Sequence, residues 1–205
     1  MGSIDYSSVS DGESNMINIA RIHYPVKTLG PGDRIGIWVA GCQKNCPGCI
    51  SPELQNKAYG RCFSTEAIMK VLMPYLSPGV GITLSGGEPF LYASGVARLL
   101  DELNRYTKDV IVFTGYTIEE LTAMNDHEVE RVLSYTGLLV DGAYIDELND
   151  GKGMRGSTNQ KFVVLGDPEK YKNPETWERE LQLVVGKGKI YSIGIPGVGQ
   201  NDKQQ

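Results

Sequence analysis

Three cysteines lie close together in the segment Gly41-Cys-Gln-Lys-Asn-Cys-Pro-Gly-Cys49. The thiols of Cys42, Cys46 and Cys49 have the spacing C-x3-C-x2-C, which suits the ligands of one iron–sulfur cluster. A cubane four-iron cluster held by only three thiolates keeps one iron free of protein ligands. Because that iron can bind a small molecule, the sequence predicts a reactive metal centre on this loop.

Two other uses of the cysteine triplet compete with a cluster. A structural zinc site normally completes its tetrahedron with a fourth Cys or His, commonly as two C-x2-C pairs, and Cys62 stands alone. A disulfide would leave one of the three cysteines over, and no signal peptide indicates an oxidising compartment. We therefore favour iron–sulfur over zinc. We expect Cys62 to be a buried apolar residue, neither a ligand nor a nucleophile.

Composition indicates one globular domain in the cytoplasm. Of the 205 residues, 40% are hydrophobic and 22% charged, which is ordinary for a globular protein. The net charge of -5 is scattered, and no Lys/Arg run interleaves with aromatics, so nucleic acid is not an expected partner. No apolar run approaches the roughly 18 residues of a membrane helix. We expect a flexible leader over residues 1–15, one domain over 16–195 and a loose tail over 196–205.

Strand and helix patterns alternate along the chain. The predicted strands cover residues 35–40, 81–85, 110–114, 137–141 and 162–165. Helices are predicted to begin near Thr65, to cover 96–103, and to begin again at a capping box of Thr117 and Glu120. This alternation implies right-handed crossovers and a mainly parallel sheet, so the fold class is α/β. Residues 181–195 are predicted to form a hairpin appended to that sheet.

Several polar and glycine positions coincide with the carboxyl ends of these predicted strands. Cys42, Gly86, Thr114 and Asp141 each lie at or just beyond such an end. Ligands of open parallel sheets bind at that edge. We therefore expect these residues to surround one ligand-binding opening, or mouth, at the carboxyl ends of the strands.

The run Ser85-Gly-Gly-Glu-Pro89 is the second informative motif. Its two glycines expose backbone groups that a ligand can approach closely, and Glu88 can anchor the loop. A Gly-Gly turn alone is a weak signal. It becomes stronger because it follows the cysteine triplet by roughly 40 residues.

With these motifs the chain resembles a radical S-adenosylmethionine enzyme, and within that superfamily the activating enzymes of anaerobic ribonucleotide reductases. The resemblance extends over residues 24–160, with its segments in the family's order and spacing. Besides the cysteine and glycine motifs, they are Tyr24-Pro-Val26, Gly30-Pro-Gly-Asp-Arg34, Phe113-Thr-Gly-Tyr116, Leu139-Val-Asp-Gly142 and Arg155-Gly-Ser-Thr-Asn-Gln160. The implied fold is a partial (β/α) barrel with, in this chain, a C-terminal hairpin extension.

The resemblance also implies a cofactor set. Cys42, Cys46 and Cys49 would bind three irons of a 4Fe-4S cluster, and S-adenosylmethionine would chelate the fourth and be cleaved to a 5'-deoxyadenosyl radical. The residues expected to hold S-adenosylmethionine are Gly48, Ile50, Ser85, Gly86, Gly87, Glu88, Thr114 and Asp141. The glycine motif would receive the methionyl ammonium, and the backbone near Gly48 would border the adenine.

The chemistry would then be carried by the cofactor, with no catalytic side chain. His23 and His127 lie away from any serine or cysteine motif, so no hydrolytic triad is indicated. The run Gly151-Lys-Gly-Met-Arg-Gly156 has the letters of a dinucleotide-binding motif, but it follows a polar loop instead of a strand. We reject a nucleotide-binding role for it.

The resemblance implies a glycyl radical enzyme as partner and a flavodoxin- or ferredoxin-type electron donor. Arg155, Asn159 and Gln160 are candidate contacts to the partner or substrate, although bracing of their own loop accounts for them equally well. The chain departs from the family after Cys49, where Ile50 replaces an aromatic residue, and in its longer C-terminal segment. Two other functions stay open: a radical enzyme acting on a peptide or metabolite, and a non-enzymatic metal-binding module.

Overall fold

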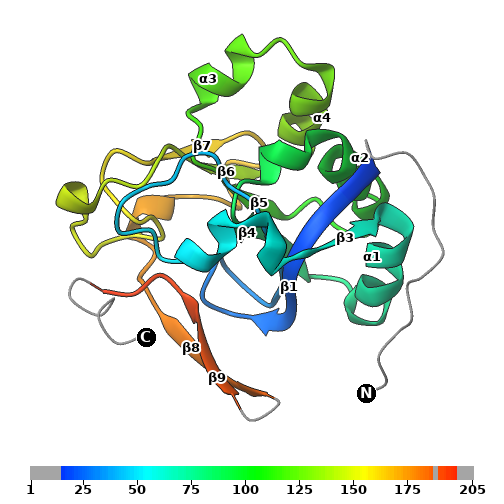
Figure 1. The fold of residues 1–205 in the computed structure, drawn as a ribbon, viewed down its shortest axis with the longest axis horizontal. Helices are drawn as coiled ribbons and strands as arrows, with labels where there is room; N and C mark the ends of the chain where they lie inside the picture. The colour runs from blue at the N-terminus through cyan, green and yellow to red at the C-terminus, as the bar shows by residue number, and fades with distance from the viewer. Residues whose placement is uncertain (1–14, 187–188, 198–205) are drawn as a thin grey trace.

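The computed structural model describes residues 15–186 and 189–197, and its centre is a seven-stranded sheet (Figure 1). The strands are β1 Met16–Val26, β2 Arg34–Val39, β3 Arg61–Ser64, β4 Gly81–Gly86, β5 Val110–Phe113, β6 Leu138–Asp141 and β7 Lys161–Val164. They are ordered β3-β1-β2-β4-β5-β6-β7. The inner strands β2, β4, β5 and β6 pair in parallel, and the outer ones pair antiparallel. The predicted α/β class is confirmed.

Four α-helices lie within the described residues: α1 Thr65–Leu72, α2 Ala93–Leu103, α3 Ile118–Ala123 and α4 His127–Tyr135. The first is capped by Ser64, whose hydroxyl accepts the amide of Ala67. The predicted capping box of Thr117 and Glu120 begins α3 and is confirmed. None of the helices in the described part of the chain has the length and apolarity needed to span a bilayer.

The two faces of the sheet have separate cores, because successive side chains of a strand point to opposite faces. On one face, Ile37, Leu84 and Val112 pack with apolar side chains of α1, α2 and α4. On the other, Ile111 and Val140 pack with residues that follow β6 in the chain. The helices thus cover one face, and the C-terminal third of the chain covers much of the other (Figure 1).

The C-terminal hairpin is present, but its predicted addition to the main sheet is wrong. Strands β8 Leu181–Gly186 and β9 Lys189–Gly194 form a separate two-stranded sheet. The hairpin docks by side chains: Ile193, 2% exposed, packs with Val26 and Trp38. Its carbonyl also accepts the Thr28 hydroxyl at 3.0 Å. The apolar inner face of the hairpin therefore covers the sheet near Trp38 instead of extending its edge.

Cys62 is exposed, so the expectation of a buried apolar residue is wrong. It lies on β3, which is the outermost strand and pairs only with β1 among the described strands. Side chains of an edge strand have a neighbouring strand on one side only, which leaves Cys62 open to solvent. The predicted leader and tail lie outside the described residues, apart from positions 15, 196 and 197.

A buried ion pair lies at the amino-terminal ends of the parallel strands. Arg34 is fully buried and contacts the Asp109 carboxylate at 2.9 Å. Its guanidinium also donates to the Thr83 hydroxyl and the Ile82 carbonyl, both at 2.7 Å. Tyr171 donates its hydroxyl to Asp109 at 2.8 Å. Burial opposes ionisation, but the hydrogen bond and charge of Arg34 hold the pKa of Asp109 below its usual value.

Replacing Asp109 with Asn should lower the free energy of unfolding by about 3–5 kcal/mol, because Arg34 would stay buried without a counter-charge. Urea denaturation at neutral pH measures the loss. Folding lowers the pKa of Asp109, so the ion pair stabilises the protein fully at pH values above the pKa of Asp109 in the unfolded state. This stabilisation is lost as the pH falls through the lower pKa of the folded state. Glu102→Gln, which breaks the exposed Glu102–Arg105 pair, is the control and should cost less than about 1 kcal/mol. Equal stability of the two variants would contradict this.

Candidate active site

The cysteine loop, residues 41–50, and the glycine loop, residues 85–89, meet at the carboxyl ends of β2 and β4. Glu88 donates its amide to the Gly41 carbonyl at 2.9 Å. A Cβ on Gly87 would lie 2.3 Å from that same carbonyl oxygen. The two loops can approach this closely only because position 87 carries no side chain.

Gly86 ends β4 in the left-handed region, with φ +106°. A Cβ there would lie 2.5 Å from the Val39 carbonyl oxygen. The amide of Gly87 donates to that oxygen at 2.7 Å. Ser85 is opposite Trp38 in the parallel register of β2 and β4. The structure therefore lays Ser85, Gly86 and Gly87 along the end of β2.

Glu88 ties the end of β4 to the end of β5. Its side chain is buried, with 1% of the residue exposed. One carboxylate oxygen accepts the Thr114 hydroxyl at 2.8 Å and the Phe90 amide at 3.1 Å, and the other accepts the Gly115 amide at 2.8 Å. Burial raises the pKa of Glu88, and these three hydrogen bonds oppose the rise. Glu88 and Thr114, both predicted site residues, are thus brought together.

Asp141 makes the equivalent connection at the end of β6. It is 1% exposed, and its two carboxylate oxygens accept the amides of Ile118 at 2.8 Å and Lys161 at 3.0 Å. These amides belong to the first turn of α3 and the first residue of β7. Asp141 therefore fixes the rim of the mouth through backbone groups.

Left-handed residues bend the cysteine loop at three positions: Gly41 with φ +104°, Asn45 with +47° and Gly48 with +70°. Gly and Asn are the residues that adopt this conformation most readily. The loop is closed at its start by the Gly41 amide, which donates to the Leu54 carbonyl at 2.7 Å. Sequence thus determines the bends locally.

All three thiols of the motif are partly buried on this one loop. Burial raises the pKa of Cys42, with the charge of Glu88 adding to the rise, and burial also raises the pKa of Cys49. In the described part of the chain, no three Cys, His, Asp or Glu side chains are arranged as a metal site as they stand. The donor set fits a 4Fe-4S cluster by its chemistry, since three thiolates on one loop are ligands that such clusters take.

Gly48 faces the loop that follows β6. A Cβ on Gly48 would lie 3.1 Å from a carboxylate oxygen of Asp146 and 3.2 Å from the ring of Tyr144. Ile50, the other residue expected near the adenine, is 48% exposed. No motif marks Tyr144 or Asp146 in the sequence. Their place just beyond a strand end was the only available signal.

Lys44, between the first two cysteines, is a second unpredicted neighbour. Its ammonium lies 3.9 Å from the centre of the Tyr116 ring and 3.1 Å from a carboxylate oxygen of Glu120. These contacts join the cysteine loop to the start of α3. The Lys44 side chain is one-fifth exposed, and its charge is engaged by these two partners.

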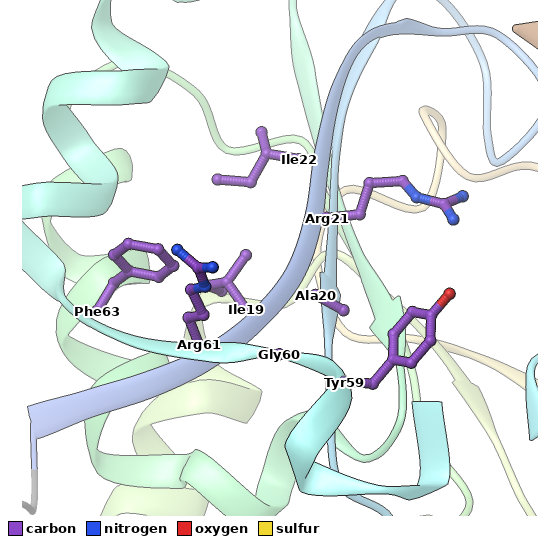
Figure 2. A pocket seen from close by; sticks show the side chains of 8 residues that line it. All are labelled: Ile19, Ala20, Arg21, Ile22, Tyr59, Gly60, Arg61 and Phe63. Atoms are coloured by element: carbon purple, nitrogen blue, oxygen red, sulfur yellow. The ribbon is translucent and has the colours of Figure 1, made fainter. Parts of the chain in front are cut away.

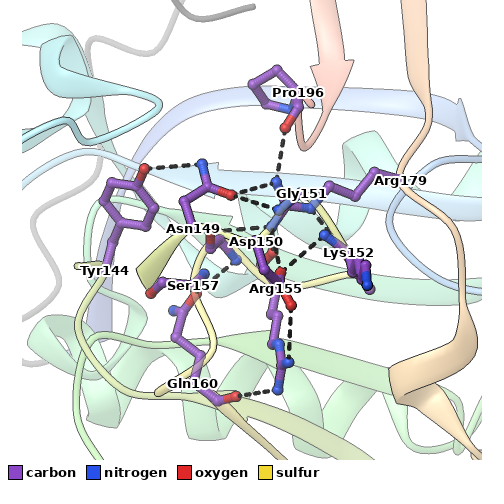
Figure 3. Close-up of polar contacts among 12 residues, drawn as sticks. Tyr144, Asn149, Asp150, Gly151, Lys152, Arg155, Ser157, Gln160, Arg179 and Pro196 are labelled. Carbon is purple, nitrogen blue, oxygen red and sulfur yellow. Dashed lines mark hydrogen bonds and ion pairs between the residues drawn. The ribbon is translucent and has the colours of Figure 1, made fainter. Parts of the chain in front are cut away.

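Gln160 (Figure 3) and Asn159 both brace their own loop. The Gln160 side chain accepts the Gly156 amide at 2.7 Å and donates to the Gly142 carbonyl at 2.7 Å. Asn159 donates its side-chain amide to a carbonyl of the same loop at 2.8 Å. Arg155 reaches the Gln160 carbonyl at 3.4 Å. Bracing is therefore observed, and contact of these residues with a partner or substrate stays a prediction.

Two hollows lie away from these motifs. Figure 2 shows one of about 300 Å³, lined by Ile19, Ala20, Arg21, Ile22, Tyr59, Gly60, Arg61 and Phe63. The second, of about 500 Å³, lies between residues 151–153 and 175–179, with Gly197 beside them. Neither lining includes a residue of the cysteine loop or the glycine loop. The candidate site is instead the place where those two loops meet, at the carboxyl ends of β2 and β4.

Residues 28–163 match the family described as "4Fe-4S single cluster domain". The chain is 34% identical over 148 residues to the anaerobic ribonucleoside-triphosphate reductase-activating protein of Escherichia coli K12, with 67% of this chain and 93% of that protein covered. It is 30% identical over 139 residues to the pyruvate formate-lyase-activating enzyme of Clostridium pasteurianum, with 62% and 54% covered. The solved structure of QueE from Escherichia coli superposes with a TM-score of 0.43 at 13% identity, covering 64% of this chain and 75% of that one.

Replacing Gly87 with Ala should displace the cysteine loop, because the new Cβ would lie 2.3 Å from the Gly41 carbonyl oxygen and 2.9 Å from that of Leu54. We expect a loss of about 2–3 kcal/mol in unfolding free energy and less iron per chain after anaerobic reconstitution. Gly79→Ala is the matched control: its φ is +90° and its Cβ would meet nothing within 4 Å. It should cost about 1–2 kcal/mol and keep its iron. Equal iron in both variants would contradict the expectation.

Proposed function

We propose that this chain, which belongs to the radical S-adenosylmethionine family of the anaerobic ribonucleoside-triphosphate reductase-activating proteins, installs a glycyl radical on a partner reductase. One observation carries the proposal: the glycine loop rests on the Gly41 carbonyl, directly before Cys42. That contact brings the cluster ligands beside backbone suited to an amino-acid group. The two elements that a radical S-adenosylmethionine site would need are therefore next to each other in the fold, which supports the proposal.

The cysteines would hold the cluster, and the glycine loop would hold the methionyl part of S-adenosylmethionine. When bound, the two cofactors supply a 5'-deoxyadenosyl radical through one-electron cleavage of the sulfonium. Gly86 and Gly87 leave the backbone open to the methionyl ammonium. The buried carboxylate of Glu88 keeps this loop in register with Thr114. The protein itself would orient the cofactor and limit the access of water to it.

The adenine would lie along the backbone of Gly48 and Ile50, next to Tyr144. The exposure of Ile50 at the rim supports this placement, because it leaves this part of the loop accessible to a ligand. Asp141 would act here by holding the strand end that carries the Tyr144 loop.

A backbone glycine of the partner is the proposed hydrogen donor. Its Cα–H bond would break as one hydrogen atom moves to the C5' carbon of the deoxyadenosyl radical, which gives 5'-deoxyadenosine and a glycyl radical. Arg155, Asn159 and Gln160 lie on a loop bordering the mouth and are proposed to guide the entering polypeptide. A flavodoxin- or ferredoxin-type protein in the cytoplasm would deliver the electron.

The decisive experiment uses anaerobic reconstitution with iron and sulfide, then dithionite, S-adenosylmethionine and an anaerobic ribonucleotide reductase. Mass spectrometry measures 5'-deoxyadenosine, and electron paramagnetic resonance measures the glycyl radical on the reductase. Cys46→Ala should lose both signals, because only two thiolate ligands remain. Cys62→Ala makes the same change at the exposed cysteine and should keep both.

Three outcomes would overturn parts of the proposal. Deoxyadenosine formation by Cys46→Ala at the wild-type rate would exclude this cysteine loop as the cluster site. Deoxyadenosine without a glycyl radical, with turnover of a peptide or metabolite instead, would replace the partner. A zinc-containing wild-type protein that makes no deoxyadenosine would reject the enzyme.

A further inference from the structure

Arg179 donates hydrogen bonds to several carbonyl groups of a loop that precedes it in the chain (Figure 3). Its side chain is only 4% exposed. The guanidinium donates to the carbonyls of Gly153 at 3.1 Å, Arg155 at 2.5 Å, Gly156 at 3.1 Å and Pro196 at 3.0 Å. Charge-assisted hydrogen bonds of this kind are roughly twice as strong as neutral ones. One side chain therefore holds residues 153–156 in place.

The same guanidinium begins a chain of contacts that ends at the cysteine loop. It donates to the side-chain oxygen of Asn149 at 2.9 Å. The amide nitrogen of Asn149 donates to the Tyr144 hydroxyl at 3.2 Å, and that hydroxyl donates to Asp146 at 2.5 Å. Asp146 and Tyr144 are the two residues against Gly48. Each link is a direct hydrogen bond or a close packing contact.

Packing leaves Tyr144 little freedom to move on its own. A Cβ on Gly156 would lie 2.7 Å from one edge of the Tyr144 ring, and a Cβ on Gly48 would lie 3.2 Å from another ring carbon. The ring is thus wedged between the loop that Arg179 holds and the loop that carries the cysteines. Tyr144 is half-buried, and because both loops contact its ring, displacement of either loop would move the ring against the other.

We infer that Arg179 is a positioning residue that, through Asn149 and Tyr144, sets the shape of the cysteine loop at Gly48. The inference rests on the proposed function in one respect, because it makes Arg179 a determinant of S-adenosylmethionine affinity at the adenine side. Arg179 lies beyond residues 28–163, the part that matches the family. The longer C-terminal segment would thereby act on the site without touching the cofactor.

Hydrogen–deuterium exchange of the protein without cluster tests the coupling directly. Arg179→Met removes the guanidinium, and Tyr144→Phe breaks the chain at a second point while keeping the ring. Amides of residues 43–50 should exchange about ten-fold faster in both variants. Arg105→Met, which replaces a 72% exposed side chain, is the matched control and should leave this segment unchanged.

Faster exchange confined to residues 149–160 would mean that Arg179 only braces its own loop, and would overturn the inference. If Arg179→Met does not fold, Tyr144→Phe and Tyr144→Ala decide the matter, since both leave Arg179 and its carbonyl contacts in place and the second also removes the ring that packs between the two loops. Unchanged exchange at residues 43–50 in both variants would then overturn the coupling.

The reconstituted protein gives an independent measurement. Titration of the reduced cluster with S-adenosylmethionine, followed by electron paramagnetic resonance, should show about five-fold weaker binding in both variants at unchanged iron content. Unchanged affinity for S-adenosylmethionine in both variants would overturn the role of Arg179 at the adenine side of the site. A wild-type cluster that does not respond to S-adenosylmethionine would reject the proposed function instead, and the exchange measurement would still judge the coupling.

Discussion

The close backbone contact between the ends of β2 and β4 is the constraint on which the mouth depends. Gly87 rests against the Gly41 carbonyl, and no side chain fits between them. From this point the strand ends are linked in series across the sheet. Glu88 joins β4 to β5, and Asp141 joins β6 to α3 and β7. The cysteine loop therefore projects from a braced edge, as preorganised sites require.

Buried charges are satisfied differently at the two ends of the parallel strands. Where the strands begin, Arg34 and Asp109 neutralise each other in the interior. Where they end, Glu88 and Asp141 have no cationic partner at hydrogen-bond distance among residues 15–186 and 189–197, and each carboxylate oxygen accepts an amide or hydroxyl hydrogen. Acids engaged in this way are poorly placed to exchange protons with a substrate. The mouth thus suits chemistry carried by a cofactor.

Sequence patterns predicted the inner strands, the capping box of Thr117 and the grouping of Glu88 with Thr114, because each depends on local periodicity or on strand ends. They did not predict β1, whose pairing with β2 is interrupted by register shifts that weaken its alternation. The four-residue β3 and the exposure of Cys62 depend on which strand lies at the edge. The separate hairpin and the Tyr144–Gly48 contact likewise arise only from tertiary packing.

Two of the contacts between the segment after residue 163 and the rest of the chain explain each other. Glycines at 151 and 153, with φ of +73° and +67°, let the loop turn its carbonyls toward one point, at a cost in conformational entropy. Arg179 offsets that cost by satisfying those carbonyls. Two residues later the hairpin begins, and Gln182 hydrogen-bonds the backbone of Pro25 and Lys27. The hairpin thus holds the segment that carries Arg179 against the sheet, and Arg179 in turn holds the glycine-rich loop through its carbonyls.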